Sequence, residues 1–221
     1  MMEQKPKNKV GLMRWYPVVL IAGMLLLLGF NAAHGQTIPV GLYLSPTGSD
    51  ATGTGAIDNP YRTFKYAISQ ASDWDTVVAL PGTYFELVQI SFSHPVHIAG
   101  YEGAANTTVS GDFGGIVFDY QGSLDSPTAR VSLIGLTITR GQPHGVQVVE
   151  WDILIKDCVI EDCQTELTEG NFLGAGIYLL FSLALIDNCT VQNNRATFSG
   201  DSGGGICAEY SAPTIRNCRI L

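Results

Sequence analysis

VSLIGLTITRG (131–141) returns three more times along the chain, as DILIKDCVIEDC (152–163), LALIDNCTVQNN (183–194) and PTIRNCRIL (213–221). Self-similarity at steps of roughly 20–50 residues is typical of stacked units that cannot bury their apolar faces alone. Each unit consists of short β-branched runs with alternating apolar positions, and not of amphipathic helices. The repeat therefore predicts an all-β protein, a parallel β-helix solenoid.

The repeats also predict the geometry of one turn of the coil, which we call a rung. The aligned positions form three apolar columns: Leu133, Ile155, Ile186 and Ile215; Leu136, Cys158, Cys189 and Cys218; and Ile138, Ile160, Val191 and Ile220. A second ladder, half a repeat away, begins at Gly115, Gly145, Gly176 and Gly205. A rung then contains at least three strands joined by bends, which favours a right-handed coil with three faces, its rungs about 4.8 Å apart.

The stacked cysteines allow two interpretations. Cys158, Cys189 and Cys218 would face inward at a spacing that a disulfide could span. Side chains stacked in register point in parallel, however, which is poor geometry for a bridge. A buried ladder of free thiols is therefore favoured over disulfides, because free cysteine is among the most buried residue types.

The N-terminus has the features of an export signal. Four basic residues precede the apolar run PVVLIAGMLLLLGF (17–30), and the small-residue stretch NAAHG (31–35) follows it. Residues 1–35 are therefore predicted to be a signal peptide that is removed after Gly35. An uncleaved anchor starting at Tyr16 is the alternative, although the run is shorter than the roughly 20 residues that a membrane span needs. Both interpretations place the rest of the chain outside the cytoplasm, at the cell surface or beyond it, and leave the signal segment as its one membrane contact.

The composition limits the partners of the mature part. Of 12 basic and 20 acidic residues, four basic ones and Glu3 lie within residues 1–35, which leaves a net charge of −11. Nucleic acid is excluded as a partner because its binding depends on basic patches. The electrostatic field of this net negative charge also repels acidic polysaccharides unless a basic cleft or a divalent cation intervenes.

One helix is expected before the repeats begin. Phe64, Ala67, Ile68 and Ala71 follow the spacing of a helix with one apolar face. A helix over Arg62–Ser72, between strands at Leu42–Leu44 and Thr76–Leu80, would cover the open end of the coil. Residues 36–111 are then the N-terminal cap and first rungs, and 112–221 the repeat rungs of the same domain. The chain stops inside a strand at Leu221, so its C-terminal end is expected to be truncated.

The segments YLSPTGSD (43–50), NPYRTFKYAISQA (59–71) and DTVVALPGTYFELVQI (75–90) resemble the N-terminal module of secreted right-handed β-helix proteins, the pectate-lyase-like superfamily. The later repeats are similar to those of bacterial polymorphic outer-membrane, adhesin-type surface proteins. The resemblance covers roughly residues 40–221. It implies the fold and export, and it leaves the activity open because the superfamily contains lyases, esterases and non-catalytic adhesins.

The catalytic motifs of that superfamily are missing from this sequence. Where pectin methylesterases have an aspartate in a Q-D-T-L motif, this chain has Gln164-Thr165-Glu166-Leu167. At the second catalytic position the counterpart, residues 193–198, contains no carboxylate. The general acid and the nucleophile of that mechanism are therefore both absent.

One charged cluster could still support chemistry. Between the first two apolar columns each repeat has a bend, and Lys156, Asp187 and Arg216 occupy the same bend position on successive rungs. A polysaccharide lyase uses a basic residue to remove the proton beside a uronate carboxylate, which a second positive charge, or calcium, neutralises. The same column is also what an alternating-charge ladder requires for stacking alone, and this interpretation is favoured.

A binding surface is the other expectation. Two insertions, 164–175 and 195–205, interrupt consecutive rungs at the same phase and should project from one edge. They could wall a glycan groove lined by Phe172, Tyr178 and Phe198. His94, His97 and His144 are interpreted as loop or surface residues. The sequence thus favours a non-catalytic surface scaffold without a cofactor or metal, with a polysaccharide lyase as the alternative, and leaves the oligomeric state open.

Overall fold

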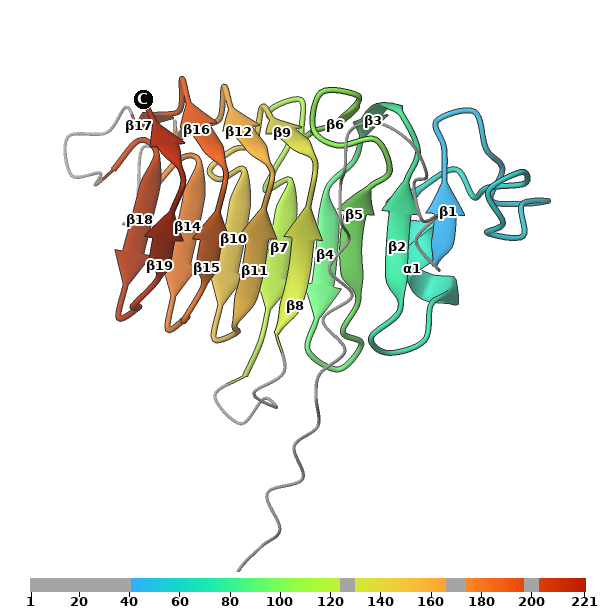
Figure 1. Cartoon of the computed structure of the whole chain (residues 1–221), viewed down its shortest axis with the longest axis horizontal. Coiled ribbons are helices and arrows are strands. Elements are labelled where there is room, and N and C mark those ends of the chain that lie inside the picture. Colours follow the sequence, from blue (N-terminus) through green and yellow to red (C-terminus); the bar gives the residue numbers. More distant parts are fainter. Residues whose placement is uncertain (1–40, 124–129, 166–173, 197–202) are drawn as a thin grey trace, which may run out of the picture. The chain divides into compact units, whose positions relative to one another are not determined.

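The computed structural model describes residues 41–123, 130–165, 174–196 and 203–221 (Figure 1). The chain divides into two units, Met1–Thr37 and Ile38–Leu221. The predicted signal peptide, residues 1–35, lies outside the described residues. Among the residues that the structure describes, no helix has both the length and the apolar character that a membrane span requires.

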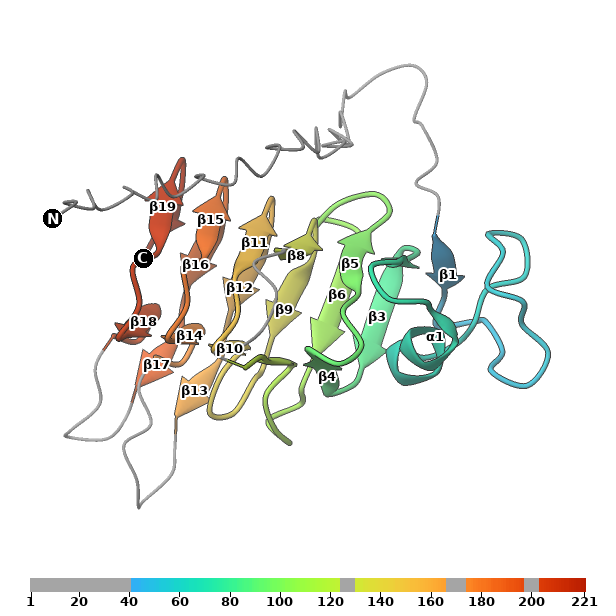
Figure 2. The same cartoon turned by 90° about the horizontal axis from the view of Figure 1, so that it is seen from below.

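The described strands of the second unit form a parallel β-helix with three long sheets (Figures 1 and 2). The first sheet has the order β1 (Leu42–Leu44), β2 (Thr76–Ala79), β5 (His97–Gly100), β8 (Val131–Ile134), β11 (Ile153–Lys156), β15 (Leu185–Asp187) and β19 (Thr214–Arg216). The second has the order β3 (Gly82–Phe85), β6 (Thr107–Ser110), β9 (Thr137–Thr139), β12 (Val159–Glu161), β16 (Thr190–Gln192) and β20 (Arg219–Ile220). The third has the order β4 (Val88–Ser91), β7 (Phe118–Gln121), β10 (Val146–Val149), β14 (Ile177–Leu180) and β18 (Ile206–Glu209). Each rung passes through the first, the second and the third sheet in this order.

The register confirms the columns that the repeats predict. Ile155 pairs with Leu133 and with Ile186, and Ile186 pairs in turn with Ile215. Ile160 pairs with Ile138 and Val191 in the same way. Apart from Ile215, which is 42% exposed on the last rung, these side chains fill the interior. Leu136, Cys158 and Cys189 are buried beside them, whereas Cys218, the last member of that column, is half-buried. All five cysteines lie in the described residues and are free thiols, as the parallel stacking favours.

The register predicted for Gly115, the first member of the glycine ladder, is wrong. Phe118 pairs with Val146, whereas the ladder beginning at Gly115 would place Ile116 there. The shift of two residues keeps Phe118 on the inward face and brings Tyr120 into the strand, where both are fully buried, and it leaves Ile116 half-buried before the strand. Burial of two large rings outweighs burial of one isoleucine, because aromatic side chains remove far more apolar area from water.

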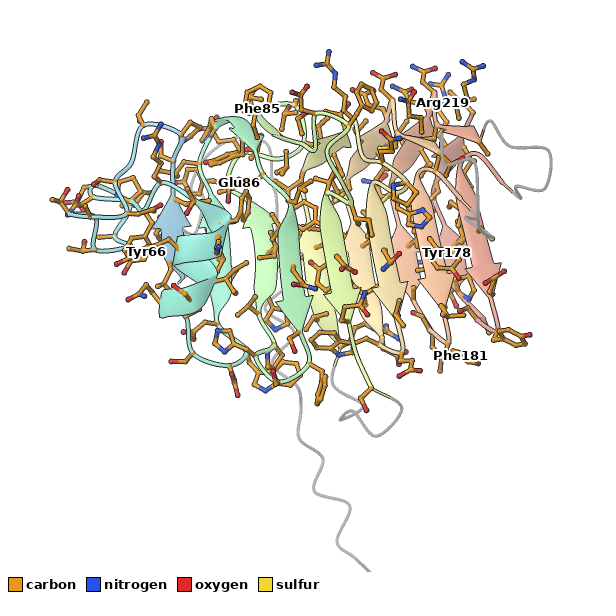
Figure 3. The ribbon with its side chains drawn as sticks, turned by 180° about the vertical axis from the view of Figure 1, so that it is seen from behind. Tyr66, Phe85, Glu86, Tyr178, Phe181 and Arg219 are labelled. Atoms are coloured by element: carbon orange, nitrogen blue, oxygen red, sulfur yellow. The ribbon has the colours of Figure 1, made fainter. Side chains whose placement is uncertain are left out.

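In the repeat rungs from β8 onward, residues in the left-handed conformation follow the strands at the described corners. The first corner, between the first and second sheets, has them at Gly135, Asp157, Asn188 and Asn217, with φ from 53° to 67°. The second corner, after the second sheet, has them at Arg140, Asp162 and Asn193. The third corner, after the third sheet, has them at Glu150, Phe181 and Tyr210. Phe85 and Arg219 of the second sheet lie along one edge of the coil, opposite Phe181 (Figure 3).

The expected capping helix is present but shorter than predicted. Helix α1 spans Phe64–Gln70, and the Thr63 side chain accepts a hydrogen bond from the Tyr66 amide at its N-terminus. Glu86 accepts further bonds from the amides of Phe64 and Lys65, at 3.1 and 3.3 Å. The amide of Arg62 is instead bound by Asp50, which keeps that residue outside the helix. The buried face of α1 packs against β1, β2 and β4 at the end of the coil.

We expect Asn188→Ala to lower the free energy of unfolding by about 1–2 kcal/mol, because a side chain other than glycine, asparagine or aspartate is strained at positive φ. The substitution also removes the bond from Asn188 Nδ2 to Asp157 Oδ1, 2.7 Å long. Urea denaturation measures the loss. Asn188→Gly is the matched control and should cost less than alanine; an equal or larger cost for glycine would contradict the role of the corner.

Candidate functional site

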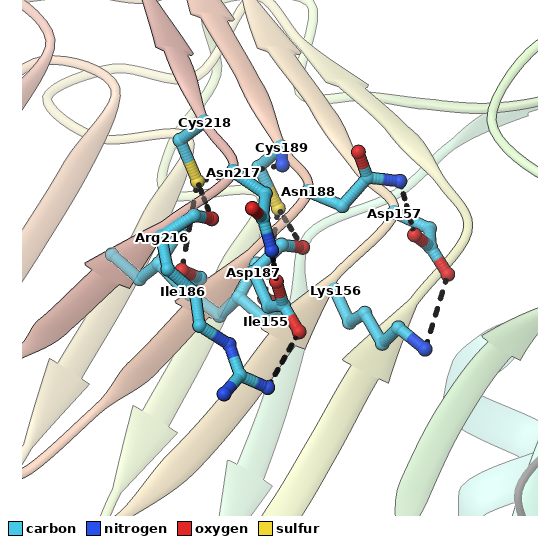
Figure 4. A network of polar contacts seen from close by, with 10 residues as sticks. All are labelled: Ile155, Lys156, Asp157, Ile186, Asp187, Asn188, Cys189, Arg216, Asn217 and Cys218. Carbon is cyan, nitrogen blue, oxygen red and sulfur yellow. Dashed lines mark hydrogen bonds and ion pairs between the residues drawn. The ribbon is translucent and has the colours of Figure 1, made fainter.

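The charged column of the first corner is assembled as the sequence predicts (Figure 4). Lys156 pairs in register with Asp187, and Asp187 with Arg216. Arg216 Nη2 donates to Asp187 Oδ2 at 2.8 Å, and Asn217 Nδ2 donates to Asp187 Oδ1 at 2.9 Å. Lys156 turns instead to its chain neighbour, with Nζ 3.7 Å from Asp157 Oδ2.

These contacts make Asp187 the centre of a structural network. Both carboxylate oxygens of Asp187 accept a hydrogen bond from the next rung. The bond from Arg216 lowers the pKa of Asp187. The corner asparagines bind the rung below, Asn188 to Asp157 and Asn217 to Asp187. Across the described ranges no three His, Cys, Asp or Glu side chains gather as a metal site. The geometry therefore matches a stacking ladder of alternating charge.

The predicted glycan groove is described in part only. Phe172 and Phe198 lie outside the described residues. The ends of the two insertions do meet, because β13 (Gln164–Thr165) pairs with β17 (Arg195–Ala196). Tyr178 faces outward in register with Cys207, and its hydroxyl donates to Glu209 Oε2 at 2.7 Å. Burial and this carboxylate raise the pKa of Tyr178.

His144 lies in the loop before β10, as interpreted, but it is not a surface residue. Its side chain is buried, with its ring stacked on Tyr178 at a centroid distance of 4.9 Å. Nδ1 donates to the carbonyl of Gly174 at 2.7 Å, and burial lowers the pKa of the imidazole. His97 is also placed in a strand, half-buried in β5. His144 stands directly before Gly145 and outside the periodic pattern of the repeats, so no sequence signal indicated its burial.

The outer face of the third sheet carries acids and amides. Asp119 Oδ1 accepts from Gln121 Nε2 at 2.5 Å and from Gln147 Nε2 at 3.1 Å. None of the described strands of this sheet contains a lysine or an arginine. This face therefore has no fixed cation with which to hold an acidic ligand.

The third corner presents an aromatic pair that the sequence reasoning missed. Backbone hydrogen bonds place Glu150, Phe181 and Tyr210 on successive rungs directly after β10, β14 and β18. The rings of Phe181 and Tyr210 stack with centroids 5.0 Å apart and planes 13° apart. Phe181 is 45% exposed and Tyr210 82%. Alignment of the residue that follows each third-sheet strand would have revealed the pair.

The backbone at these two positions is unusual for aromatic residues. Phe181 has a φ of 50° and Tyr210 a φ of 47°. Positive φ favours glycine, asparagine and aspartate, and a bulky residue there is strained by about 1–3 kcal/mol. The first corner uses the favoured residue types at every one of its left-handed positions. Strained residues cluster at binding sites, and exposed apolar patches mark interaction surfaces.

Acidic residues lie at or next to this corner in the chain. Glu150 occupies the corner position one rung before Phe181, and Glu209 directly precedes Tyr210. Asp152 Oδ1 accepts the Leu183 amide at 2.9 Å. One cation lies close by, since Arg130 Nη2 donates to the Leu183 carbonyl at 3.3 Å. We call Glu150, Asp152, Phe181, Glu209 and Tyr210 the third-corner site.

Comparison with known proteins confirms the handedness of the coil. Residues 121–220 match the family model described as the right handed beta helix region. A Bacillus subtilis (strain 168) protein, "Uncharacterized protein YwoF", is 32% identical over 109 residues, which are 45% of this chain and 23% of that protein. The chain thus spans less than a quarter of the length of this relative.

Two solved structures are similar at low identity. A rhamnogalacturonan lyase has a TM-score of 0.44 at 14% identity, covering 80% of this chain and 56% of its own. The pectin methylesterase from Aspergillus niger has a TM-score of 0.43 at 12% identity, covering 82% of this chain and 75% of its own. Likenesses this distant carry no argument about activity. The described coil is a right-handed parallel β-helix.

We predict that Asp187 and Arg216 are energetically coupled. In a double-mutant cycle with Asp187→Ala and Arg216→Ala, the double variant should lose less stability than the sum of the single variants, because either change already breaks the ion pair. Since the folded pKa of Asp187 is lowered, the coupling should be present above the unfolded carboxyl pKa, about 3.9, and disappear as the pH falls through the folded value.

Urea denaturation at pH 7 and at about pH 2.5 measures this cycle. Lys156→Ala combined with Arg216→Ala is the control, because no bond joins these two side chains and their effects should add. Additive losses for Asp187 and Arg216 at pH 7 would contradict the ladder.

Proposed function

We propose that this protein is an exported, non-catalytic β-helix scaffold that binds glycans at the cell surface or outside the cell. The observation that carries the proposal is the exposed, stacked pair of Phe181 and Tyr210 at the third corner. The part of this pair that is exposed offers a sugar apolar contact area at low entropic cost, and tyrosine adds a hydroxyl.

The backbone supports binding over packing as the role of this pair. An exposed ring gains little from burial, so hydrophobic stabilisation does not offset the strain of a positive φ. The solenoid supplies rigidity at this corner, because the amides of Glu150 and Phe181 donate to the carbonyls of Leu180 and Glu209 on the next rung. A ligand would therefore meet a preorganised surface.

Export is supported by the N-terminal sequence. Basic residues precede an apolar run that ends in a small-residue stretch closing at Gly35. This order is that of a secretory signal peptide. Together with repeats similar to those of adhesin-type outer-membrane proteins, it places the scaffold at the bacterial-type cell surface in our proposal.

A lyase mechanism receives less support from the first corner. Its base would be Lys156, whose ammonium group lies beside the carboxylate of Asp157. The carboxylate of Asp187 holds Arg216 and Asn217, and these bonds belong to the ladder between rungs. We therefore assign Lys156, Asp187 and Arg216 to stability.

Affinity electrophoresis tests the proposal, with chitosan, xylan or polygalacturonate in the native gel. At least one polysaccharide should retard the purified protein, and Phe181→Ala or Tyr210→Ala should weaken the binding about tenfold, as expected for aromatic anchors. Phe85→Ala is the matched control, because Phe85 is also exposed but lies along the opposite edge (Figure 3). It should bind as the wild type does.

The same samples are followed for the absorbance of unsaturated products with calcium present. Retardation by none of the polysaccharides, or retardation unaffected by both aromatic substitutions, would contradict the proposed site. Product formation that is lost in Lys156→Ala would overturn the non-catalytic assignment.

A further inference from the structure

We propose that His94 is a pH-sensitive latch that fastens the capping helix α1 to the segment between β4 and β5, and that the latch is closed while the imidazole is protonated. The inference concerns the N-terminal cap and is independent of glycan binding. It follows from the two acceptors that the fold places at the two ring nitrogens of His94.

Both ring nitrogens of His94 face groups that accept hydrogen bonds and do not donate them. Nδ1 lies 2.8 Å from Asp73 Oδ1, and Nε2 lies 2.9 Å from the carbonyl oxygen of Ile68. A neutral imidazole carries one N–H, so in either tautomer one of these contacts would set a lone pair against an oxygen. The protonated ring donates to both oxygens, and the geometry therefore selects the charged form.

The carbonyl of Ile68 needs a donor because α1 ends nearby. The amide of Ser72, which would be its donor in a longer helix, donates instead to Asp75 Oδ2 at 2.7 Å. The amide of Ala71 shares its bond between this carbonyl and the preceding one. His94 supplies a further donor, and its positive charge is favourable beside the last carbonyls of a helix.

The charged side chains that shift the pKa of His94 are Asp73 and Asp75, both in the segment between α1 and β2. The bond to the Ile68 carbonyl raises this pKa most, burial opposes it, and the two carboxylates add to the rise. The segment 92–96 contains no other charged residue. The side chain of His94 is 35% exposed, so solvent protons can reach it.

The helix depends on such contacts because it is only seven residues long. A helix of this length is not stable alone in water, so tertiary contacts hold it in place. At its N-terminal end Glu86 accepts from the amides of Phe64 and Lys65, and Asp50 accepts from the amide and hydroxyl of Thr63. Burial raises the pKa of Glu86. The carboxylates at this end lose their charge as the pH falls, whereas the latch at the other end opens as the pH rises.

The direction of the pH dependence follows from the raised pKa of His94. The latch contributes fully below the unfolded pKa of histidine, about 6.5, and its contribution is lost as the pH rises through the folded value. The buried face of α1, with Phe64 and Ala67, covers the end of the coil. Alkaline pH therefore loosens this cover at its C-terminal end and leaves the rungs paired.

Two NMR measurements on the purified protein test the latch. A pH titration of the His94 ring nitrogens should give a pKa above about 6.5, the value of an unperturbed histidine. The amides of Ala67 and Ala71 should lose protection from hydrogen exchange, relative to an unstructured chain at the same pH, by about two- to fivefold between about pH 6 and about pH 8.5. An amide of the repeat rungs, such as that of Ile160, should keep its protection.

Three variants assign the effect. His94→Gln should make the protection of α1 independent of pH over this range, because glutamine does not titrate. His97→Gln is the matched control and should keep the pH dependence, because Nδ1 of His97 contacts Ser132 Oγ of β8 at 3.0 Å and burial lowers its pKa. Asp73→Asn should move the midpoint to lower pH, since the bond to the Ile68 carbonyl remains and a neighbouring negative charge is lost.

The titration of the unsubstituted protein decides the question even where a variant is unstable. A pKa of His94 at or below that of an unperturbed histidine would overturn the latch. Protection of α1 that does not change with pH, or a change that persists in His94→Gln, would overturn it as well.

Discussion

The repeat rungs from β8 onward depend on left-handed residues that follow the strands at their corners, in register from rung to rung. At the first corner a single residue at positive φ redirects the chain between sheets without lengthening the rung, so neighbouring strands stay paired and their side chains stay in columns. Because these parallel strands are stacked in register, the residue at a corner faces the same position of the next rung. Each corner is thus a ladder as well as a turn.

The first and third corners use this constraint in different ways. At the first corner glycine, aspartate and asparagine match the backbone, and their side chains join successive rungs through Asp157 and Asp187. At the third corner Phe181 and Tyr210 oppose the backbone preference and remain exposed. In our proposal the charge at the first corner therefore serves stability, and the exposed aromatic surface at the third corner serves binding.

Most of the fold could be predicted because it repeats. Columns such as Ile138, Ile160 and Val191 recur at the same place in each unit, and in-register stacking is the arrangement that buries all of them. The register failed at Gly115, where the sequence alone did not reveal that two aromatic rings would displace Ile116 from the core. The burial of His144 and the pairing of Phe181 with Tyr210 were missed for a related reason: each involves residues about 30 positions apart that are brought together by a loop of variable length. Of the predicted groove, Tyr178 alone falls in the described residues.

If the third-corner aromatics serve binding at a cost to the fold, a variant that combines Phe181→Asn with Tyr210→Asn should keep its stability. Asparagine tolerates positive φ, so relief of strain should offset the loss of the ring stack, itself about 0.5–1.5 kcal/mol. Urea denaturation should give a free energy of unfolding within about 1 kcal/mol of the wild type, or above it, while glycan binding is lost. A loss of about 3 kcal/mol or more, the size expected when packed core aromatics are removed, would show that the pair serves the fold and would contradict the account.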